Sequence, residues 1–213
     1  MNYIYLDTET TGLNPSQHSI VQLSGIIKTK DREETFNFKM KPYHNEEVDP
    51  IAAKVTGYTT EEVYTWEDSS VVFKQFIDLL DSFNITYGTK FNLVGYNVGF
   101  DSDFIREWFK INGKNWGYYV WFPYIDVMSM ANLHFIGNRA KIKNFKLTTI
   151  YFEVFGRNFP SPHDALSDVK ATIELFEFFC SKLYMPALRK SEVETTETPP
   201  EKVEIKVRPR KVV

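Results

Sequence analysis

The feature that most constrains this chain is a pair of acidic residues at the end of an apolar alternation near its start. Residues 3–6 alternate as a β-strand does, and Asp7 and Glu9 follow two residues apart. Side chains with this spacing on a strand share a face, so the two carboxylates repel each other unless a cation lies between them. A solvent-facing pair on an edge strand is the alternative. The apolar neighbours and the polar exit at residues 10–12 favour a divalent-metal site.

The composition of the 213 residues limits the classes of protein that the chain can be. With 43% hydrophobic and 16% aromatic residues, it has enough apolar material for one well-buried domain. Cys180 is the single cysteine, which excludes an intramolecular disulfide and a thiolate metal cluster. The net charge is −3, and up to residue 188 there are 23 acidic against 18 basic residues, which excludes a basic protein that wraps nucleic acid. An acidic body that handles a polyanion needs metal ions or local basic groups at its site.

No stretch of the sequence is typical of a membrane protein or of a secreted one. Its apolar runs are shorter than the ~20 residues that a membrane span needs. The first residues lead into a strand without the basic region of a signal peptide. We therefore expect a soluble, cytoplasmic protein with no membrane contact.

The periodicity of the apolar residues predicts an α/β domain. After the first strand, residues 20–27 and 35–40 are predicted strands joined by a charged turn, which suggests an antiparallel meander. A short strand at 92–96 and another near Val120 follow. Helices are predicted at 71–83, 101–111, 126–134, 145–155 and 164–183. Strands first, and then strands alternating with helices, indicate a mixed sheet.

The periodic pattern ends near residue 188. Residues 189–213 are polar and charged, contain prolines and have no apolar period. We therefore expect a folded domain of residues 1–188 and a disordered, charged C-terminal tail of residues 189–213. The basic end of this tail, residues 206–211, is either a solubilising segment or a tether to a partner or to nucleic acid.

Two further acids stand near predicted helix starts. Asp101 follows the strand at 92–96, where α/β sheets place their chemistry but where an aspartate also stabilises a helix N-terminus. Asp168 lies five residues after His163, a spacing that puts the two on different faces of a continuous helix. A shared site therefore requires His163 to precede the helix, with Asp164 as its N-cap. Taken separately, each residue is better explained as a cap or a surface group.

Three motifs taken together carry a resemblance to a known family. They are Asp7-x-Glu9-Thr10-Thr11-Gly12, Asn97-x-x-Phe100-Asp101 and His163-x-Ala165-x-x-Asp168. In this order and spacing they resemble the DEDDh family of 3′–5′ exonucleases, over roughly residues 3–184. The resemblance implies a ribonuclease H-like fold, in which a five-stranded mixed sheet is flanked by helices.

The resemblance also implies a role for each site residue. Asp7, Glu9, Asp101 and Asp168 would bind two divalent metal ions, Mg²⁺ or Mn²⁺, which prefer hard oxygen ligands. His163 would be the general base, because an imidazole titrates near neutral pH. The residues expected to bind the 3′-terminal nucleotide are Thr8, Thr10, Gly12, Leu13, Thr56, Asn97 and Phe100. Leu13 would be an apolar wedge between the last two bases, and Phe100 is equally well explained as a core aromatic.

The expected activity is metal-dependent 3′–5′ hydrolysis of single-stranded DNA, which releases nucleoside 5′-monophosphates. An exoribonuclease or oligoribonuclease is one alternative, since only contacts to a 2′-hydroxyl separate the two. A non-catalytic module that binds 3′ ends is another. Tyr96 stands where the family often has histidine, so a secondary substrate contact can differ. The tail has no recognisable clamp-binding motif, which leaves open both a proofreader that meets a replication protein through its tail and a stand-alone, phage-encoded nuclease.

Overall fold

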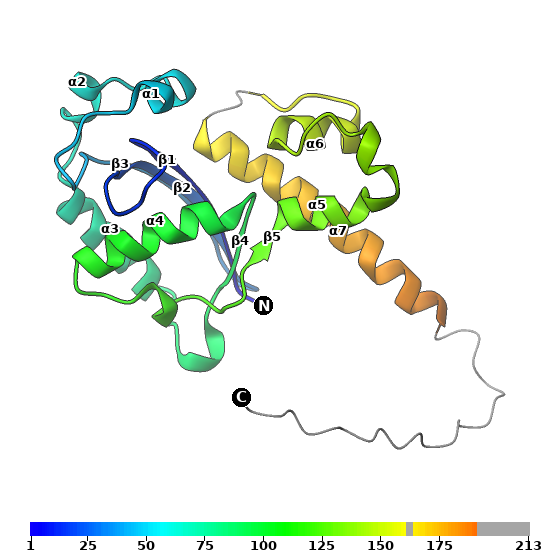
Figure 1. Cartoon of the computed structure of the whole chain (residues 1–213). Coiled ribbons are helices and arrows are strands. Elements are labelled where there is room, and N and C mark those ends of the chain that lie inside the picture. The colour runs from blue at the N-terminus through cyan, green and yellow to red at the C-terminus, as the bar shows by residue number, and fades with distance from the viewer. Residues whose placement is uncertain (161–163, 191–213) are drawn as a thin grey trace, which may run out of the picture. The chain divides into compact units, whose positions relative to one another are not determined.

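The computed structural model describes residues 1–160 and 164–190, with side chains as far as residue 182 (Figure 1). Met1–Phe179 form one compact unit, and Cys180–Val213 form a second, whose described residues continue the last helix to Lys190. The domain boundary at residue 188 stays a prediction, because most of the tail lies outside the described residues.

The first unit is built on a five-stranded sheet of order β3-β2-β1-β4-β5 (Figure 1). The strands are β1 (Tyr3–Thr10), β2 (Ile20–Lys28), β3 (Glu33–Lys39), β4 (Asn92–Gly95) and β5 (Ile125–Asp126). β1 and β3 are antiparallel to β2, while β4 is parallel to both β1 and β5. The predicted meander and the ribonuclease H-like α/β class, with its mixed sheet, are confirmed.

The fifth strand differs from the prediction. A single parallel bridge joins Phe91 to Val120, whereas the strand itself, β5, comes later in the chain. The aromatic residues before the bridge form a 3-10 turn, η2 (Trp116–Tyr118). Pro123 has no N–H to donate to a ladder, and the pairing of β5 begins after it.

Helices flank the sheet. They are α1 (Pro50–Thr56), α2 (Thr60–Val63), α3 (Ser69–Asp81), α4 (Val98–Ile111), α5 (Val127–His134), α6 (Leu147–Phe155) and α7 (Ala165–Lys190), with 3-10 turns η1 (Tyr87–Thr89) and η3 (Ile136–Lys141). α4 begins earlier than predicted because Asn97, in a left-handed conformation with φ 59, precedes it. α6 ends at Gly156 as predicted, and α7 continues past its predicted end. None of the helices in the described part of the chain has the length and apolar character needed to cross a bilayer.

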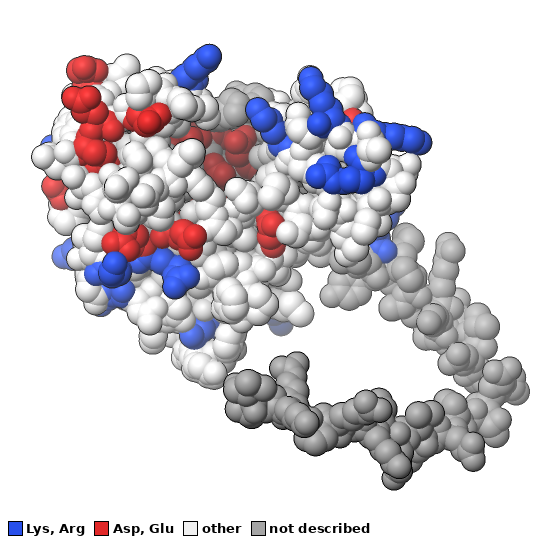
Figure 2. Space-filling model, viewed as in Figure 1, with Lys and Arg blue, Asp and Glu red and all other residues white. Residues whose placement is uncertain are grey.

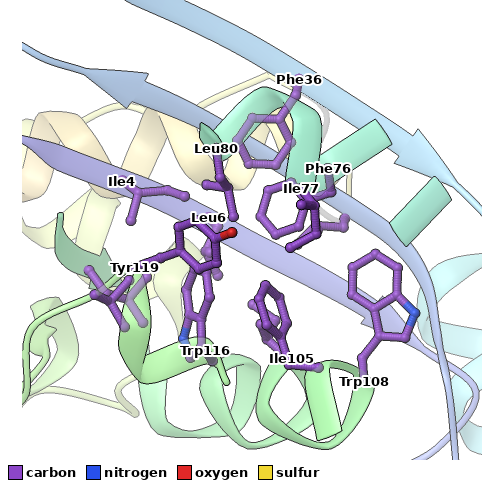
Figure 3. Close-up of a cluster of buried hydrophobic side chains, with 14 of the residues drawn as sticks. Ile4, Leu6, Phe36, Phe76, Ile77, Leu80, Ile105, Trp108, Trp116 and Tyr119 are labelled. Carbon is purple, nitrogen blue, oxygen red and sulfur yellow. The ribbon is translucent and has the colours of Figure 1, made fainter. Parts of the chain in front are cut away.

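The main core joins the sheet to α3 and α4 (Figure 3). Its members include Ile4 and Leu6 of β1, Phe76 and Leu80 of α3, and Ile105 and Trp108 of α4. The indole N–H of Trp108 donates to Ser69 Oγ at 2.7 Å, so its polar atom is satisfied inside the core. Because each such side chain contributes ~1.5–3 kcal/mol on burial, this layer holds β1 and α4 in a fixed relation.

The alternate residues of β1 point to the opposite face, which α7 covers. The rings of Tyr3 and Tyr5 lie 5.7 and 6.0 Å from that of Phe176 on α7. Asp7 and Glu9 continue the same alternation toward the end of the strand. The predicted acidic pair therefore lies on the α7 face of the central strand.

Candidate active site

Four carboxylates from three elements gather near the carboxyl end of β1. Asp7 and Glu9 extend from the strand, Asp101 from the first turn of α4 and Asp168 from the first turn of α7. The charges of the other three all act on the carboxyl group of Asp7. Acidic side chains are visible in a hollow in the upper part of Figure 2. The structure thus brings together four acids that are spread over most of the folded sequence.

Asp101 is held in place by Thr8. Its Oδ1 accepts hydrogen bonds from the backbone N–H of Thr8 at 2.9 Å and from Thr8 Oγ1 at 2.8 Å. The Asp101 side chain is buried, with only 3% exposure. Thr8, predicted to contact substrate, therefore also orients one of the four acids.

Burial and mutual repulsion raise the pKa of these acids. The pKa of Glu9 is raised to about 8, first by burial and then by the charges of Asp168 and Asp101. Burial raises the pKa of Asp101 to about 7, although the two bonds from Thr8 act to lower it. Burial, followed by the charges of Asp101 and Glu9, raises the pKa of Asp7 well above its usual range. A cation among these groups would offset both causes.

The donor set suits a hard divalent cation. Asp7, Glu9, Asp101 and Asp168 offer only carboxylate oxygens, which Mg²⁺ and Mn²⁺ prefer as ligands. As the side chains stand, no three His, Cys, Asp or Glu residues among those described are grouped closely enough to hold an ion. The chemistry of the residues fits a metal, and the arrangement of two ions stays a prediction.

A cleft of about 320 Å³ opens beside these acids, with Glu9 in its wall. Six of the seven predicted substrate residues line it, namely Thr8, Thr10, Gly12, Leu13, Thr56 and Phe100. Leu13 is 81% exposed and so is free to meet a ligand. Phe100 lines the cleft and also packs against the core, with its ring 5.0 Å from that of Phe104; its contact with substrate stays a prediction.

On α1 the sequence predicted Thr56 as a substrate residue, but not the two apolar residues that line the cleft beside it. Ile51 and Val55, one turn apart, line the cleft and are 73% and 49% exposed. α1 has no buried residue. An apolar pair at this spacing on a helix that buries nothing is the signal that could have identified the wall. Asn14 and His18, after β1, also line the cleft.

Two of the predicted site residues, Asn97 and His163, are not among the described residues that line the cleft. Asn97 does not line the cleft; its N–H donates to Asp126 Oδ1 at 2.8 Å, and it begins the helix that carries Asp101. His163 lies outside the described residues. Asp164 is described, and its Oδ2 accepts from the N–H of Ser167 at 3.1 Å, so its predicted capping of α7 is confirmed.

A family model described as Exonuclease matches residues 4–176. The chain belongs to the exonuclease family. Its three motifs place this exonuclease in the DEDDh class, which confirms the resemblance found in the sequence. The domain is that of a 3′–5′ exonuclease.

Two relatives carry the name of DNA polymerase III. The exonuclease is 27% identical over 196 residues to DNA polymerase III PolC-type of Thermotoga petrophila, which covers 90% of this chain and 13% of that protein. It is 30% identical over 144 residues to DNA polymerase III subunit epsilon of Pasteurella multocida, which covers 65% of this chain and 54% of that one. The chain thus spans about an eighth of the length of its PolC-type relative.

Solved structures share the fold of the exonuclease. E. coli exonuclease I in complex with a dT13 oligonucleotide superposes with a TM-score of 0.67 at 21% identity, over 89% of this chain and 43% of that one. The nuclease domain of 3′hExo, a DEDDh family member bound to rAMP, has a TM-score of 0.65 at 20% identity, over 85% of this chain and 92% of that one. At these identities the likeness concerns the fold.

Proposed function

We propose that this exonuclease depends on divalent metal ions and removes nucleoside 5′-monophosphates from the 3′ end of single-stranded DNA. The proposal rests on the position of Glu9, which is one of the four clustered acids and also lines the cleft. A terminal nucleotide in the cleft would therefore present its phosphate to the acids. Unpaired ends suit such a site because they enter it without the cost of melting a duplex.

The preference for DNA is supported by the named relatives. The epsilon and PolC-type proteins carry the name of DNA polymerase III, and exonuclease I has been seen with a dT13 oligonucleotide. 3′hExo was bound to rAMP, which keeps RNA as the competing substrate. The preference between DNA and RNA depends on whether the cleft can accommodate a 2′-hydroxyl group.

Each site residue has its own proposed role in hydrolysis. Asp7, Glu9, Asp101 and Asp168 would hold the ions, which supply charge stabilisation at the phosphate when bound. Thr8 keeps Asp101 oriented toward the cluster. His163 would accept the proton of the attacking water. Leu13 and Phe100 would pack against the terminal bases, as exposed apolar groups do at single-strand sites.

The direct test is degradation of 5′-labelled DNA and RNA oligonucleotides in Mg²⁺, Mn²⁺ or EDTA. We expect a ladder that shortens from the 3′ end by single nucleotides, faster on DNA, and no products in EDTA. Asp7→Asn should abolish the ladder, whereas Asp31→Asn, on the exposed β2–β3 turn, should leave it intact.

Each other outcome rejects part of the proposal. Faster cleavage of RNA would make the protein an exoribonuclease. Binding of 3′ ends with no cleavage in either metal would make it a non-catalytic module. Full activity in EDTA would remove the role of the carboxylates as metal ligands.

A further inference from the structure

An exposed basic segment, residues 139–146, stands out on an acidic protein. Its cations are Arg139, Lys141, Lys143 and Lys146, all exposed. From residue 127 to residue 152 the sequence has no Asp or Glu. Within the part of the chain that the structure describes, none of the four is in an ion pair. Their charges are therefore available to an anion from outside.

The basic segment is held in a defined conformation. The guanidinium of Arg139 lies over the ring of Phe145, 3.8 Å from its centroid. Asn144 Oδ1 accepts from the N–H of Lys146 at 3.0 Å and from Thr149 Oγ1 at 2.8 Å, which ties the end of the segment to α6. The backbone that carries its lysines is thus held by contacts at both ends of the segment.

Tyr96 links this segment to the start of the helix that carries Asp101. Its hydroxyl donates a 2.7 Å hydrogen bond to the backbone carbonyl of Phe145. Tyr96 directly follows β4 and precedes Asn97, where the helix that carries Asp101 begins. In Figure 2, Lys and Arg side chains gather over the region of η3 and α6, beside the hollow that contains acidic groups. A nucleic-acid strand that extends from the acids toward this side would therefore meet these cations next.

We propose that the basic segment binds the phosphate backbone of a single strand a few nucleotides before the 3′ end. The inference rests on the proposed function and names a second contact region for the same substrate. The acids of the site repel a polyanion, and lysines outside it would compensate for this repulsion by releasing counterions from the strand. Lysine is a point charge on a flexible stem, which suits contacts that ignore sequence.

The test compares two triple variants with the same change in charge. The first is Lys141→Gln, Lys143→Gln and Lys146→Gln; Arg139 is kept because it packs on Phe145. The control is Lys30→Gln, Lys74→Gln and Lys114→Gln, three exposed lysines on the β2–β3 turn, on α3 and after α4. KM and kcat are measured on oligothymidylates of about 15 nucleotides and on dinucleotides, since a binding path of about 4–16 nucleotides is typical for single strands.

We expect the first variant to raise KM on the long substrate about ten-fold or more at low salt, with unchanged kinetics on the dinucleotide. The dependence of log Kd on log salt should lose roughly 0.7 in slope for each phosphate contact removed. The control variant should match the wild type both in KM on the long substrate and in the salt dependence of Kd. Equal behaviour of the two triple variants on the long substrate would overturn the inference.

A second readout separates this inference from the proposed function. Binding of a fluorescein-labelled oligothymidylate in EDTA is followed by anisotropy, where no cleavage is needed. If the wild type never cleaves but the first variant still binds more weakly than the control, the function fails and the contact region stands. If both variants bind like the wild type, the basic segment is only a solubilising surface.

Discussion

The imidazole of His18 packs over Gly12 so closely that a Cβ on the glycine would collide with the ring. Nδ1 of His18 lies 3.1 Å from the backbone nitrogen of Asn14 and 3.2 Å from its carbonyl oxygen, and these contacts hold the ring in place. Both Gly12 and His18 line the cleft. The shape of the cleft therefore depends on a contact between two residues of one short loop.

Gly12→Ala should displace this ring and distort the cleft. Because the displaced ring lines the cleft, we expect weaker binding there, and KM for a single-stranded oligonucleotide should rise about ten-fold, which corresponds to a loss of ~1.4 kcal/mol in binding. The double variant Gly12→Ala/His18→Ala should recover most of the loss, because the vacated ring leaves room for the methyl group. Steady-state kinetics of the wild type, both single variants and the double variant decide this. The same KM in Gly12→Ala and in the double variant would contradict the steric explanation.

Thr8→Val tests the support of Asp101. Valine keeps the backbone N–H and the shape but removes the Oγ1 donor, a bond to a charged group worth ~1.5–3 kcal/mol. Asp101 should then hold its proton more strongly, so half-maximal activity should need more Mg²⁺, and Tm should fall by several degrees. Thr65→Val, at an exposed threonine whose hydroxyl donates to a carbonyl, is the matched control. An unchanged Mg²⁺ requirement would reject this role of Thr8.

Without metal, the free energy of unfolding should fall as the pH rises. The pKa of Glu9 is raised to about 8 and that of Asp101 to about 7, above the ordinary range of carboxyl groups in an unfolded chain. The folded chain therefore binds more protons than the unfolded chain between about pH 4 and 8. The stabilisation is fully present below about pH 4 and is lost as the pH rises through these two values.

Thermal unfolding in EDTA measures this effect. We expect a Tm several degrees higher at about pH 5 than at about pH 8, since each kcal/mol shifts Tm by ~2–4 °C in a chain of this size. Mg²⁺ should restore the loss at the higher pH, and Glu9→Gln should flatten the decline. If Tm in EDTA instead rises toward pH 8, the pKa values of these acids are not raised in the folded chain.

Leu13→Ala should impair substrate binding without affecting stability. The side chain is 81% exposed, and surface substitutions usually change the free energy of unfolding by less than ~0.5 kcal/mol. Leu133→Ala, at an exposed leucine on α5, is the matched control. We expect a several-fold higher KM for a single strand only in Leu13→Ala, with Tm unchanged in both. Parallel effects of the two substitutions would show that Leu13 is not a wedge.

His163→Ala separates proton transfer from metal binding. A general base typically contributes ~10²–10⁴-fold to the rate, so single-turnover cleavage at saturating Mg²⁺ should slow by that factor. The rise in Tm caused by Mg²⁺ should persist, because the imidazole is not a proposed ligand. Asp168→Ala should lose both the activity and most of the metal-induced shift. Wild-type cleavage by His163→Ala would make the histidine structural.

The parts of the fold that the sequence predicted well are those with a strong period or a specific stop. The alternation of residues 3–6 predicted β1, and the spacing of Asp7 and Glu9 predicted that they share one of its faces. Gly156, at φ 66, ends α6 as its chemistry suggests. Such signals are local, because the side chain that carries each one also determines the backbone there.

The features that the sequence did not predict are those whose conformation depends on tertiary contacts. β5 has only two residues and takes its pairing from β4, so no period could reveal it. The resemblance carried by the motif of Asn97 predicts a substrate contact, which stays a prediction; it did not reveal the left-handed conformation in which Asn97 precedes α4, because that conformation depends on neighbours such as the carboxylate of Asp126. The wall made by Ile51 and Val55 was missed because apolar residues are usually assigned to a core.

Phe176 of α7 rests on Tyr3 and Tyr5 of β1, so the last helix of the compact unit closes onto its first strand. On the ribosome, β1 leaves the exit tunnel long before α7 has been synthesised. Throughout elongation the nascent chain carries the two carboxylates of the strand without their counterpart from that helix. A translation product that stops before α7 lacks Asp168 and therefore cannot assemble the cluster of four acids.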